Sequence, residues 1–412
     1  MVRPRDLVLY GGQEQSAHPQ LPRASVITMN AAERRSVAVL AFVMMARLLG
    51  LFLLLPVLAM HADTLRGATP ALGGLAVGAY GITQAVFQFP FGLLSDRYGR
   101  KPIIVIGLAV FACGSLVAAR ATSIAVLIAG RALQGAGAIS GAVMALVADL
   151  TRPDVRTRAM AAIGVSIGAS FMLALLLGPL LESVIGVRGL FLCGVALAVV
   201  AVALVVLAVP AAALPRTSGP RRLGEALAVP ALLVLDGGVF LLHVLLTALF
   251  VAVPYLLRDD LGLAEGKQWL FYLGALTLSL AGTIPMIVAV ERGGATVFAW
   301  RLSALLLGGG AALLTAATQL WQALAGMLLF FAGFNFLEAR LPAEISRRAD
   351  EGRRGAALSV FGIAQFMGAF AGGAVGGILR GQSGARAVFA VCTCLALIGA
   401  GGAVLATRRD PG

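Results

Sequence analysis

Charged residues, histidine, lysine and cysteine are all scarce in this chain. Only 12% of the 412 residues are charged, whereas 59% are hydrophobic and the mean hydropathy is +0.94. A soluble chain of this length could not bury so much apolar surface, so we predict a polytopic membrane protein. The three histidines are too few for a histidine-rich metal transporter.

Reactive groupings are equally sparse. The four cysteines all lie inside apolar runs, at Cys113, Cys193, Cys392 and Cys394. We therefore expect small packing residues rather than disulfides or a metal site. We find no nucleophile beside a base, no phosphate loop and no metal cluster, so neither an enzyme nor a bound cofactor is expected.

Apolar sequence is abundant, and it is divided into twelve segments of membrane-spanning length. A helix needs about 20 residues to cross a hydrocarbon core of about 30 Å, and backbone in lipid must form its hydrogen bonds internally. We therefore predict an all-α integral membrane protein with twelve transmembrane helices in the lipid bilayer. Their approximate cores are 36–60, 71–94, 102–120, 123–148, 157–181, 187–209, 231–257, 268–290, 296–316, 321–342, 356–379 and 385–406.

The net charge of +13 comes mainly from cations in the short loops between these segments. Such loops carry topology signals, so the charge does not indicate a nucleic-acid partner. Lys and Arg number 23 on the side of the amino terminus and seven on the other, with Arg47 and Arg131 inside the membrane. This bias predicts that both termini lie in the cytoplasm.

Polar stretches precede the apolar segments and divide them in the middle. The first 33 residues contain no apolar core long enough for a secretory signal, so we predict a disordered cytoplasmic tail. The interruption between the sixth and seventh segments contains Pro215, Gly219 and Pro220, which is typical of a linker. The predicted divisions are a tail at 1–33, a six-helix bundle at 34–209, a cytoplasmic linker at 210–230, a second six-helix bundle at 231–407 and a short tail at 408–412.

The two bundles repeat each other in sequence. A shift of 195 residues places Asp96-Arg97-x-Gly99 on Glu291-Arg292-x-Gly294, and Ala148-Asp149 on Ala343-Glu344. Charged pairs at one offset on one face of the membrane do not easily match by chance. We infer two parallel six-helix halves, with a substrate site between them near the midplane.

A charged loop from Gly92 to Pro102 joins the second and third segments. Gly99 permits a tight reversal, and Pro102 suits the first turn of a helix. The loop resembles the G-x-L-x-D-R-x-G-R-K pattern between helices two and three of the major facilitator superfamily, where it clamps the two halves on the cytoplasmic side. A loop that only anchors topology is the alternative. The resemblance implies a clamp made by Gly92, Asp96, Arg97, Gly99, Arg100 and Lys101, with Asp149 as its acidic partner.

Two more patterns resemble this superfamily. Arg131 to Gly135 is similar to its R-x-x-Q-G pattern; Arg131 would lie roughly 10 Å deep and face the cavity beside Gln134, unless it snorkels. Gly168, Gly178 and Pro179 loosely resemble the antiporter pattern G-x8-G-x3-G-P. The Gly-Gly pair that follows in the family is replaced by Leu181-Glu182 here, so close helix packing stays an alternative for these glycines.

Other polar residues inside the apolar segments are candidates for a substrate or proton pathway, because polar groups in a membrane are costly. We expect Glu338 and His243 to couple protons, since a carboxylate or an imidazole can titrate near neutral pH. A hydrogen-bonded packing role is the alternative for His243, and Asp236 is expected at the membrane interface. The remaining candidates are Arg47, Gln84, Gln88 and Asn335; Gly74, Gly78, Gly368, Gly372 and Gly376 are assigned to helix packing.

The chain is most similar to the YajR-type bacterial transporters of this superfamily, over about Ala32 to Thr407. The similarity rests on Gly81 to Gly92, Gly130 to Gly135 and Val143 to Leu146. It implies a proton-driven exporter of the bacterial inner membrane with drug-like substrates. Members of this type often carry a soluble domain after the last helix, and we expect none before the end at Gly412.

We therefore predict a monomeric secondary transporter that works by alternating access and exports small, drug-like solutes by antiport, powered by the proton gradient. Two alternatives stay open. One is a proton symporter or uptake carrier for an anionic solute, which Arg47 and Arg131 would suit. The other is a membrane receptor that transports nothing.

Overall fold

The computed structural model describes residues 28–210, 229–293, 296–350 and 354–408, with side chains described up to residue 399. These residues form helices and no strand, apart from an isolated bridge between Arg66 and Ser123. Most of the predicted tail at 1–33 and of the predicted linker at 210–230 lies outside the described residues, as does 409–412. Those predicted divisions therefore stay predictions.

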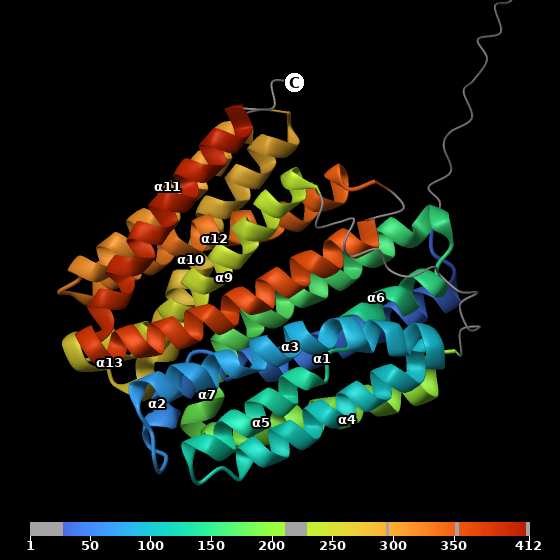
Figure 1. The fold of residues 1–412 in the computed structure, drawn as a ribbon, viewed down its shortest axis with the longest axis horizontal. Coiled ribbons are helices and arrows are strands. Elements are labelled where there is room, and N and C mark those ends of the chain that lie inside the picture. The colour runs from blue at the N-terminus through green and yellow to red at the C-terminus, as the bar shows by residue number, and fades with distance from the viewer. Residues whose placement is uncertain (1–27, 211–228, 294–295, 351–353, 409–412) are drawn as a thin grey trace, which may run out of the picture.

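Within each half, the helices follow one another along the chain (Figure 1). In chain order they are α1 (Ala31–Phe52), α2 (Leu58–Asp63), α3 (Pro70–Tyr98), α4 (Arg100–Ala119), α5 (Ile124–Ala136), α6 (Ser140–Asp149), α7 (Pro153–Ala208), α9 (Pro230–Tyr255), η1 (Leu256–Asp260), η2 (Glu265–Lys267), α10 (Gln268–Glu291), α11 (Thr296–Ala316), α12 (Leu320–Arg348) and α13 (Arg354–Arg408).

Twelve membrane spans arise from these elements, as predicted. Ten helices in the described part of the chain are long and apolar enough to cross a membrane. Two of the ten are about twice the needed length: α7 has 56 residues and α13 has 55. Each is interrupted by one residue in the left-handed region, Gly186 at φ 66° and Gly384 at φ 79°, which glycine adopts without a Cβ clash. Each therefore supplies two spans.

Two predicted segments are broken inside the membrane, which hydropathy does not reveal. The segment predicted at 36–60 consists of α1 and α2, separated by a turn at 53–57 that contains Pro56. The segment predicted at 123–148 consists of α5 and α6, separated at 137–139. At the second break a Cβ on Gly137 would collide with the backbone carbonyl of Gly107, so the chain bends where α4 approaches most closely.

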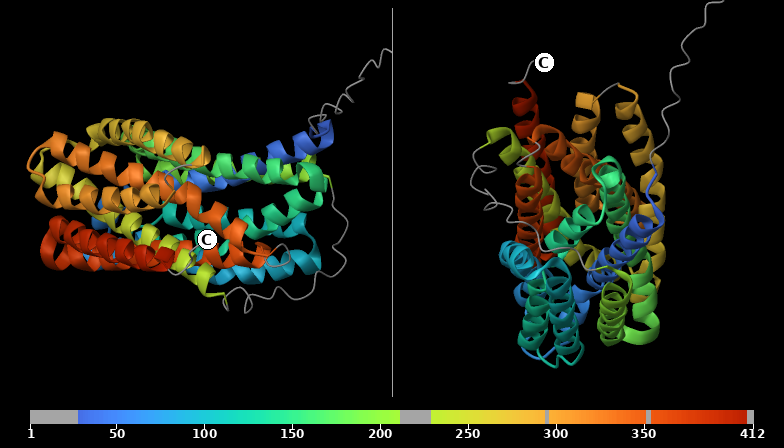
Figure 2. Two further views of the ribbon diagram at one scale, coloured as in Figure 1. Left: turned by 90° about the horizontal axis from the view of Figure 1, so that it is seen from above. Right: turned by 90° about the vertical axis from the view of Figure 1, so that its right-hand side faces the viewer.

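The two largest cores of buried side chains correspond to the two halves, and a third core, which contains Leu58 and Phe191 of the first half and Val251 and Tyr255 of the second, joins them. One core runs from Val37 to Val209, and another runs from Leu232 to Ala396 with Leu175 added from the first half. Figures 1 and 2 show the blue-to-green half and the yellow-to-red half as two bundles packed along their length. Apolar burial thus stabilises each half and also the contact between them.

Glycines with positive φ confirm the internal repeat. They form three pairs, Gly67 with Gly262, Gly99 with Gly293 and Gly186 with Gly384, at separations of 195, 194 and 198 residues. Each pair marks the same connection in both halves. The uniform shift of 195 residues pairs Gly99 with Gly294; the left-handed residue lies one position earlier, at Gly293, directly after Arg292 ends α10.

The halves meet along α3 and α13, where glycine replaces side chains. A Cβ on Gly78 would lie 2.7 Å from the carbonyl oxygen of Phe370, and a Cβ on Gly373 equally close to that of Gly74. The contact extends from Pro70 to Gln88 on α3, about 27 Å at 1.5 Å per residue. The predicted packing roles are confirmed; Gly368, Gly372 and Gly376 contact α9 instead, at Phe240, Val244 and Ala248.

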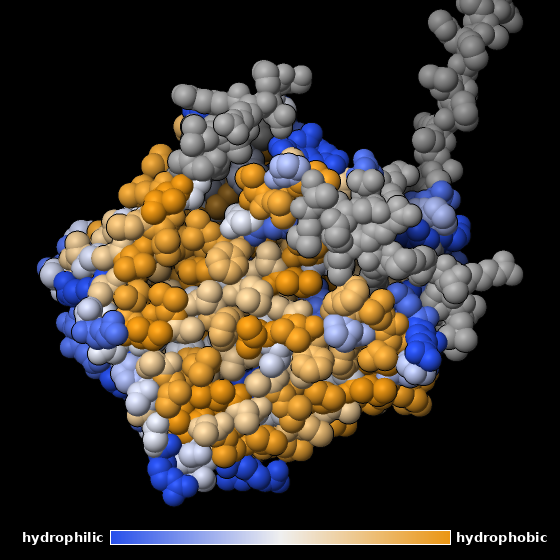
Figure 3. Space-filling model, viewed as in Figure 1, coloured by the Kyte–Doolittle hydropathy of each residue, from blue (hydrophilic) through white to orange (hydrophobic). Residues whose placement is uncertain are grey.

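The outer surface agrees with a membrane environment. The face in Figure 3 is largely apolar, and its hydrophilic residues gather toward the two ends of the long axis. Large apolar side chains are exposed on many helices, among them Val165, Leu207 and Phe298. Such a belt is expected where lipid rather than water covers the protein.

Candidate functional site

The turn between α3 and α4 brings the predicted clamp residues together. Gly99 has φ 97°, so the chain reverses there and places Arg100 beside the last turn of α3. The buried Arg100 guanidinium pairs with Asp96, donates to Ser95 Oγ over 2.9 Å and donates from Nε to Asp149 Oδ2 over 3.2 Å. We call Asp96, Arg100 and Asp149 the clamp cluster, and the side of the molecule that carries it the Asp96 end.

Lys101 binds the end of α7 and does not contact the clamp cluster in the described part of the chain. Its ammonium donates to the carbonyl oxygens of Val206 and Val209, over 2.9 and 2.8 Å, at the end of α7. These carbonyls have no partner in the helix, and a cation there also favours the negative end of the helix dipole. Arg97 lies over the ring of Tyr98, 5.3 Å from its centroid. Among the described residues, Arg100 and Lys101 contact only the first half, and a clamp between the halves stays a prediction.

Tyr80 lies between the two intramembrane arginines of the first half. The guanidinium carbons of Arg47 and Arg131 lie 5.7 and 5.3 Å from the centroid of the Tyr80 ring. Arg47 also pairs with Gln84 and donates to Ser140 Oγ over 3.3 Å. Cation–π contacts and amide oxygens therefore stabilise two charges that have been removed from water.

Arg131 is held by the first half itself. It donates to Gln134 Oε1 over 2.8 Å and to the backbone oxygen of Ala76 over 3.3 Å, while Gln134 donates onward to Ser115 Oγ over 2.7 Å. We expected this side chain to face a cavity, and that expectation is corrected: Arg131 is only 3% exposed and Arg47 is 0% exposed. Gln84 donates to Gln88 over 3.3 Å, so both predicted glutamines belong to the same buried network.

The second half brings His243 and Glu338 together through a residue that the sequence did not single out. Gln365 on α13 donates from Nε2 to Glu338 Oε1 over 3.0 Å, and the same nitrogen lies 2.9 Å from His243 Nε2. Glu338 Oε2 lies 3.8 Å from His243 Nε2, is buried and has no hydrogen-bond partner in the described part of the chain. We call these three residues, on α9, α12 and α13, the proton cluster.

Hydrogen bonding fixes the tautomer of His243. Its Nδ1 lies 3.1 Å from the carbonyl oxygen of Val239, which can only accept, so Nδ1 carries the hydrogen. The other ring nitrogen then accepts from Gln365 when the imidazole is neutral. Asn335 lies outside this contact, because its amide donates to Ser279 Oγ over 3.2 Å. Asp236 is 7% exposed, and its Oδ1 has no hydrogen-bond partner among the described residues; its position at the membrane interface stays a prediction.

An ion pair joins the two halves at the opposite end of the molecule. Arg380 on α13 donates through Nη1 and Nη2 to the two carboxylate oxygens of Asp63 on α2, over 2.8 and 2.9 Å. Tyr255 donates its hydroxyl to Asp63 Oδ2 over 2.6 Å, and its ring centroid lies 3.9 Å from the Arg380 guanidinium carbon. We call these three residues the latch and their side of the molecule the Asp63 end. From the sequence alone, Arg380 is one of the seven cations on the side opposite the amino terminus.

The glycines of α7 differ in their surroundings. Nothing lies within 4 Å of a Cβ built on Gly164 or Gly168, whereas a Cβ on Gly178 would lie 2.5 Å from the carbonyl oxygen of Leu53. Close packing therefore explains Gly178 and not Gly168. Pro179 follows Gly178 and lines a cavity at the Asp63 end.

Comparisons with known proteins agree with this geometry. Residues 40–337 match the family described as the Major Facilitator Superfamily. The chain is 43% identical over 390 residues to the inner membrane transport protein YajR of Escherichia coli, a match that covers 93% of this chain and 85% of that protein.

Two further matches are more limited. Multidrug resistance protein D of Escherichia coli is 39% identical over 118 residues, which cover 28% of this chain and 30% of that protein. Among solved structures, a bacterial homologue of the human lysosomal transporter Spinster, in an inward-facing and occupied conformation, superposes with a TM-score of 0.76 at 14% identity. That superposition covers 92% of this chain and 98% of the other, and it supports the fold alone.

Proposed function

The chain belongs to the Major Facilitator Superfamily as a YajR-like transporter, and from this premise we propose that it exports small, drug-like solutes in exchange for protons. The proposal joins three described groups: the proton cluster inside the second half, the latch at one end and the clamp cluster at the other. The partial match to a protein named for multidrug resistance supports the class of solute.

The observation that carries proton coupling is the unpartnered oxygen of Glu338. A buried carboxylate oxygen without a hydrogen bond is unfavourable, and a proton would satisfy it. If the proton instead binds His243 Nε2, that nitrogen becomes a donor and can no longer accept from Gln365. The imidazolium then faces Glu338 Oε2, 3.8 Å away, and forms an ion pair. Proton arrival thus rearranges contacts between α9, α12 and α13.

Contacts at the two ends of the molecule would control alternating access to the substrate site. Opening the Asp63 end requires the bidentate contact between Asp63 and Arg380 to break, because these residues belong to different halves. At the Asp96 end, Arg100 holds the last turn of α3 and the end of α6 together through Asp96 and Asp149. We propose that the halves rock about the α3–α13 contact, so that the Asp63 end and the Asp96 end open alternately. Both halves are present in one chain, so a monomer suffices.

Orientation determines the direction of transport. The cation count of 23 against seven supports a cytoplasmic Asp96 end, with both termini in the cytoplasm of a bacterial cell and the protein in its inner membrane. Protons entering from the Asp63 end would then move down their gradient. Each charge that crosses 100 mV supplies about 2.3 kcal/mol for export.

Anion uptake loses its main support. It relied on Arg47 and Arg131 being available to a solute, and both guanidiniums are buried and committed to Tyr80 and to side-chain amides of their own half. No described contact favours a receptor that transports nothing, and we propose neither.

Transport in liposomes tests the proposal. The purified chain is reconstituted with a pH-sensitive dye inside, and proton movement is recorded while cationic and anionic solutes are added. Protons should leave the compartment that the solute enters. Glu338→Gln should still exchange solute across the vesicle but stop responding to a pH gradient, whereas Glu291→Gln, an exposed acid after the last turn of α10, should behave as wild type. A retained pH response in Glu338→Gln would remove the proton cluster from the mechanism.

A further inference from the structure

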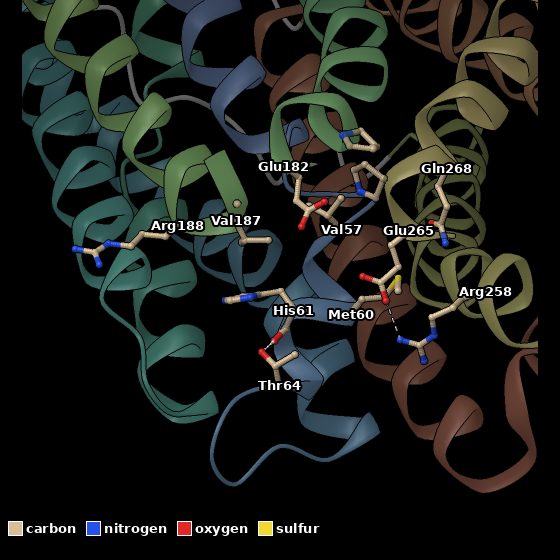
Figure 4. Close-up of a pocket in the computed structure, with 13 residues that line it drawn as sticks. Val57, Met60, His61, Thr64, Glu182, Val187, Arg188, Arg258, Glu265 and Gln268 are labelled. Atoms are coloured by element: carbon tan, nitrogen blue, oxygen red, sulfur yellow. Dashed lines mark hydrogen bonds and ion pairs between the residues drawn. The ribbon is translucent and has the colours of Figure 1, made fainter. Parts of the chain in front are cut away.

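A cavity of about 410 Å³ lies at the Asp63 end, between the two halves (Figure 4). The first half lines it with α2 and with α7 around Gly186; the second half lines it with Arg258 of η1, Glu265 of η2 and Gln268 at the start of α10. Its size falls within the range of small-molecule sites, about 300 to 1,000 Å³. No step of the proposed transport cycle has used this cavity.

Three oxygen acceptors from the two halves converge on the cavity. Figure 4 shows the carboxylates of Glu182 and Glu265 pointing into the same space. The Glu182 carboxylate makes no hydrogen bond or ion pair with any residue that the structure describes. Gln268 is 3% exposed; its Nε2 donates to the backbone oxygen of Pro254 over 3.1 Å, and its Oε1 accepts no hydrogen bond in the described part of the chain. These oxygen atoms can therefore accept hydrogen bonds from a bound solute or contact a cation.

The basic groups nearby do not neutralise these acceptors. Arg258 is shared between Glu265, at 3.2 Å, and Asp259, at 2.6 Å, so this group keeps a net negative charge. Arg188 points away from the cavity in Figure 4. Burial lowers the pKa of His61 below its usual value, so the imidazole is neutral at pH 7. One carboxylate from each half therefore faces the space, and the Glu265 carboxylate shares the Arg258 guanidinium with Asp259.

Apolar side chains make up much of the remaining wall, beside His61 and Thr64. Pro56, Val57 and Met60 line it from the first half, with Pro179 and Val187 on either side of the Gly186 turn. An apolar wall with a few convergent acceptors is complementary to a ligand that combines an apolar body with a positive charge. Methionine also adapts its shape to different apolar groups.

We propose that this cavity binds an amphipathic organic cation, held between Glu182 and Glu265 with its apolar body against Val57, Met60 and Val187. The inference rests on the proposed transport function and names the solute class: organic cations. Because the two carboxylates come from different halves, a cation between them removes their repulsion. Binding therefore favours the conformation in which the Asp63 end is closed.

The test measures equilibrium binding of tetraphenylphosphonium to the full chain in phosphatidylcholine nanodiscs, with empty nanodiscs as the blank and no pH gradient. Wild type should bind this cation, and should bind the uncharged triphenylphosphine oxide at least tenfold more weakly. Glu182→Gln and Glu265→Gln should each weaken tetraphenylphosphonium binding about tenfold. Glu182→Asp should retain most of the affinity, and Glu291→Gln should change nothing.

Three results would overturn the inference: no binding by wild type, equal binding of the uncharged compound, or wild-type affinity in both glutamine variants. The transport assay separates this failure from that of the proposed function. Proton-coupled transport with tetraphenylphosphonium binding unaffected by either substitution refutes the cavity alone. Binding that depends on Glu182 in a protein that moves no solute with protons refutes proton coupling alone.

Discussion

Replacing Asp63 by asparagine should open the Asp63 end. Arg380 donates two hydrogen bonds to this carboxylate, and Tyr255 donates a third. Asparagine keeps one oxygen but presents an amide donor to the guanidinium where the second oxygen was, and it removes the negative charge. The substitution therefore leaves the Arg380 guanidinium without its counter-charge.

The size of the effect follows from the environment of the pair. A hydrogen bond to a charged group contributes about 1.5 to 3 kcal/mol. The side chain of Asp63 is 34% exposed, so water recovers part of this loss and we expect about 1.5 to 2 kcal/mol. The ratio of open to closed molecules at the Asp63 end should then rise roughly 12- to 30-fold, since 1.4 kcal/mol corresponds to a factor of ten.

Distances between spin labels on the two halves measure this ratio. Arg120 and Lys267 are exposed at the Asp63 end, one on each half, and accept labels as cysteines once the four native cysteines are replaced. Asp63→Asn should increase the population with the longer distance. Asp259→Asn is the matched control, because Asp259 is exposed and pairs with its neighbour Arg258 in the same half. Identical distance distributions in Asp63→Asn and wild type would refute the latch.

Three further outcomes are expected, each checked by thermal unfolding of purified protein in nanodiscs. Gly178→Ala should destabilise the protein by about 1 to 3 kcal/mol, because the added Cβ would collide with the Leu53 carbonyl. Gly168→Ala should be neutral or stabilising, because nothing lies near its Cβ position. Equal effects of the two substitutions would contradict the packing role of Gly178. Lys101→Ala should destabilise the protein by about 0.5 to 1 kcal/mol, because the carbonyl oxygens at the end of α7 lose their donor. Arg97→Ala should have no such effect. An unfolding midpoint of Lys101→Ala equal to that of wild type would exclude this capping role. Burial lowers the pKa of His61, so the unfolded chain takes up its proton first. The contribution of His61 to the free energy of unfolding is then complete above its usual pKa of 6.5 and is lost as the pH falls below that value. His61→Asn should therefore reduce the loss of stability between pH 7.5 and pH 5.5.

The spans and the clamp cluster were predictable because their causes are local. Lipid leaves a long apolar segment little choice but a helix, so length and composition alone placed all twelve spans. Asp96 and Arg100 are one helical turn apart in sequence and pair at that separation, and the Gly99 reversal is visible as a glycine between charges. Even so, the breaks inside 36–60 and 123–148 went unnoticed, because they depend on what packs against the chain rather than on its hydropathy.

The latch and the proton cluster could not be derived completely, since both depend on how helices are rotated. In a soluble helix the apolar face identifies the buried side, but a membrane helix is apolar toward lipid and toward protein alike. The sequence pattern therefore predicts a depth for Arg131 but does not indicate which way its side chain points. Asp63 and Arg380 are separated by 317 positions, and Gln365 was one polar residue in an otherwise apolar segment. Polarity in the membrane identified His243 and Glu338; only the fold identified the residue between them.

The glycine contact between α3 and α13 restricts which halves can be combined. The backbones of α3 and α13 are in contact at Gly74, Gly78 and Gly373. The two halves therefore fit together only if the small residues of α3 lie opposite the small residues of α13. A chimera that takes residues 28–210 from this chain and the remainder from a relative would pack α3 of this chain against the α13 of the relative. One bulkier residue at any of these crossings would force the bundles apart. Domain shuffling among relatives should therefore succeed only where these crossings coincide, and α3 and α13 should change in evolution as a single unit.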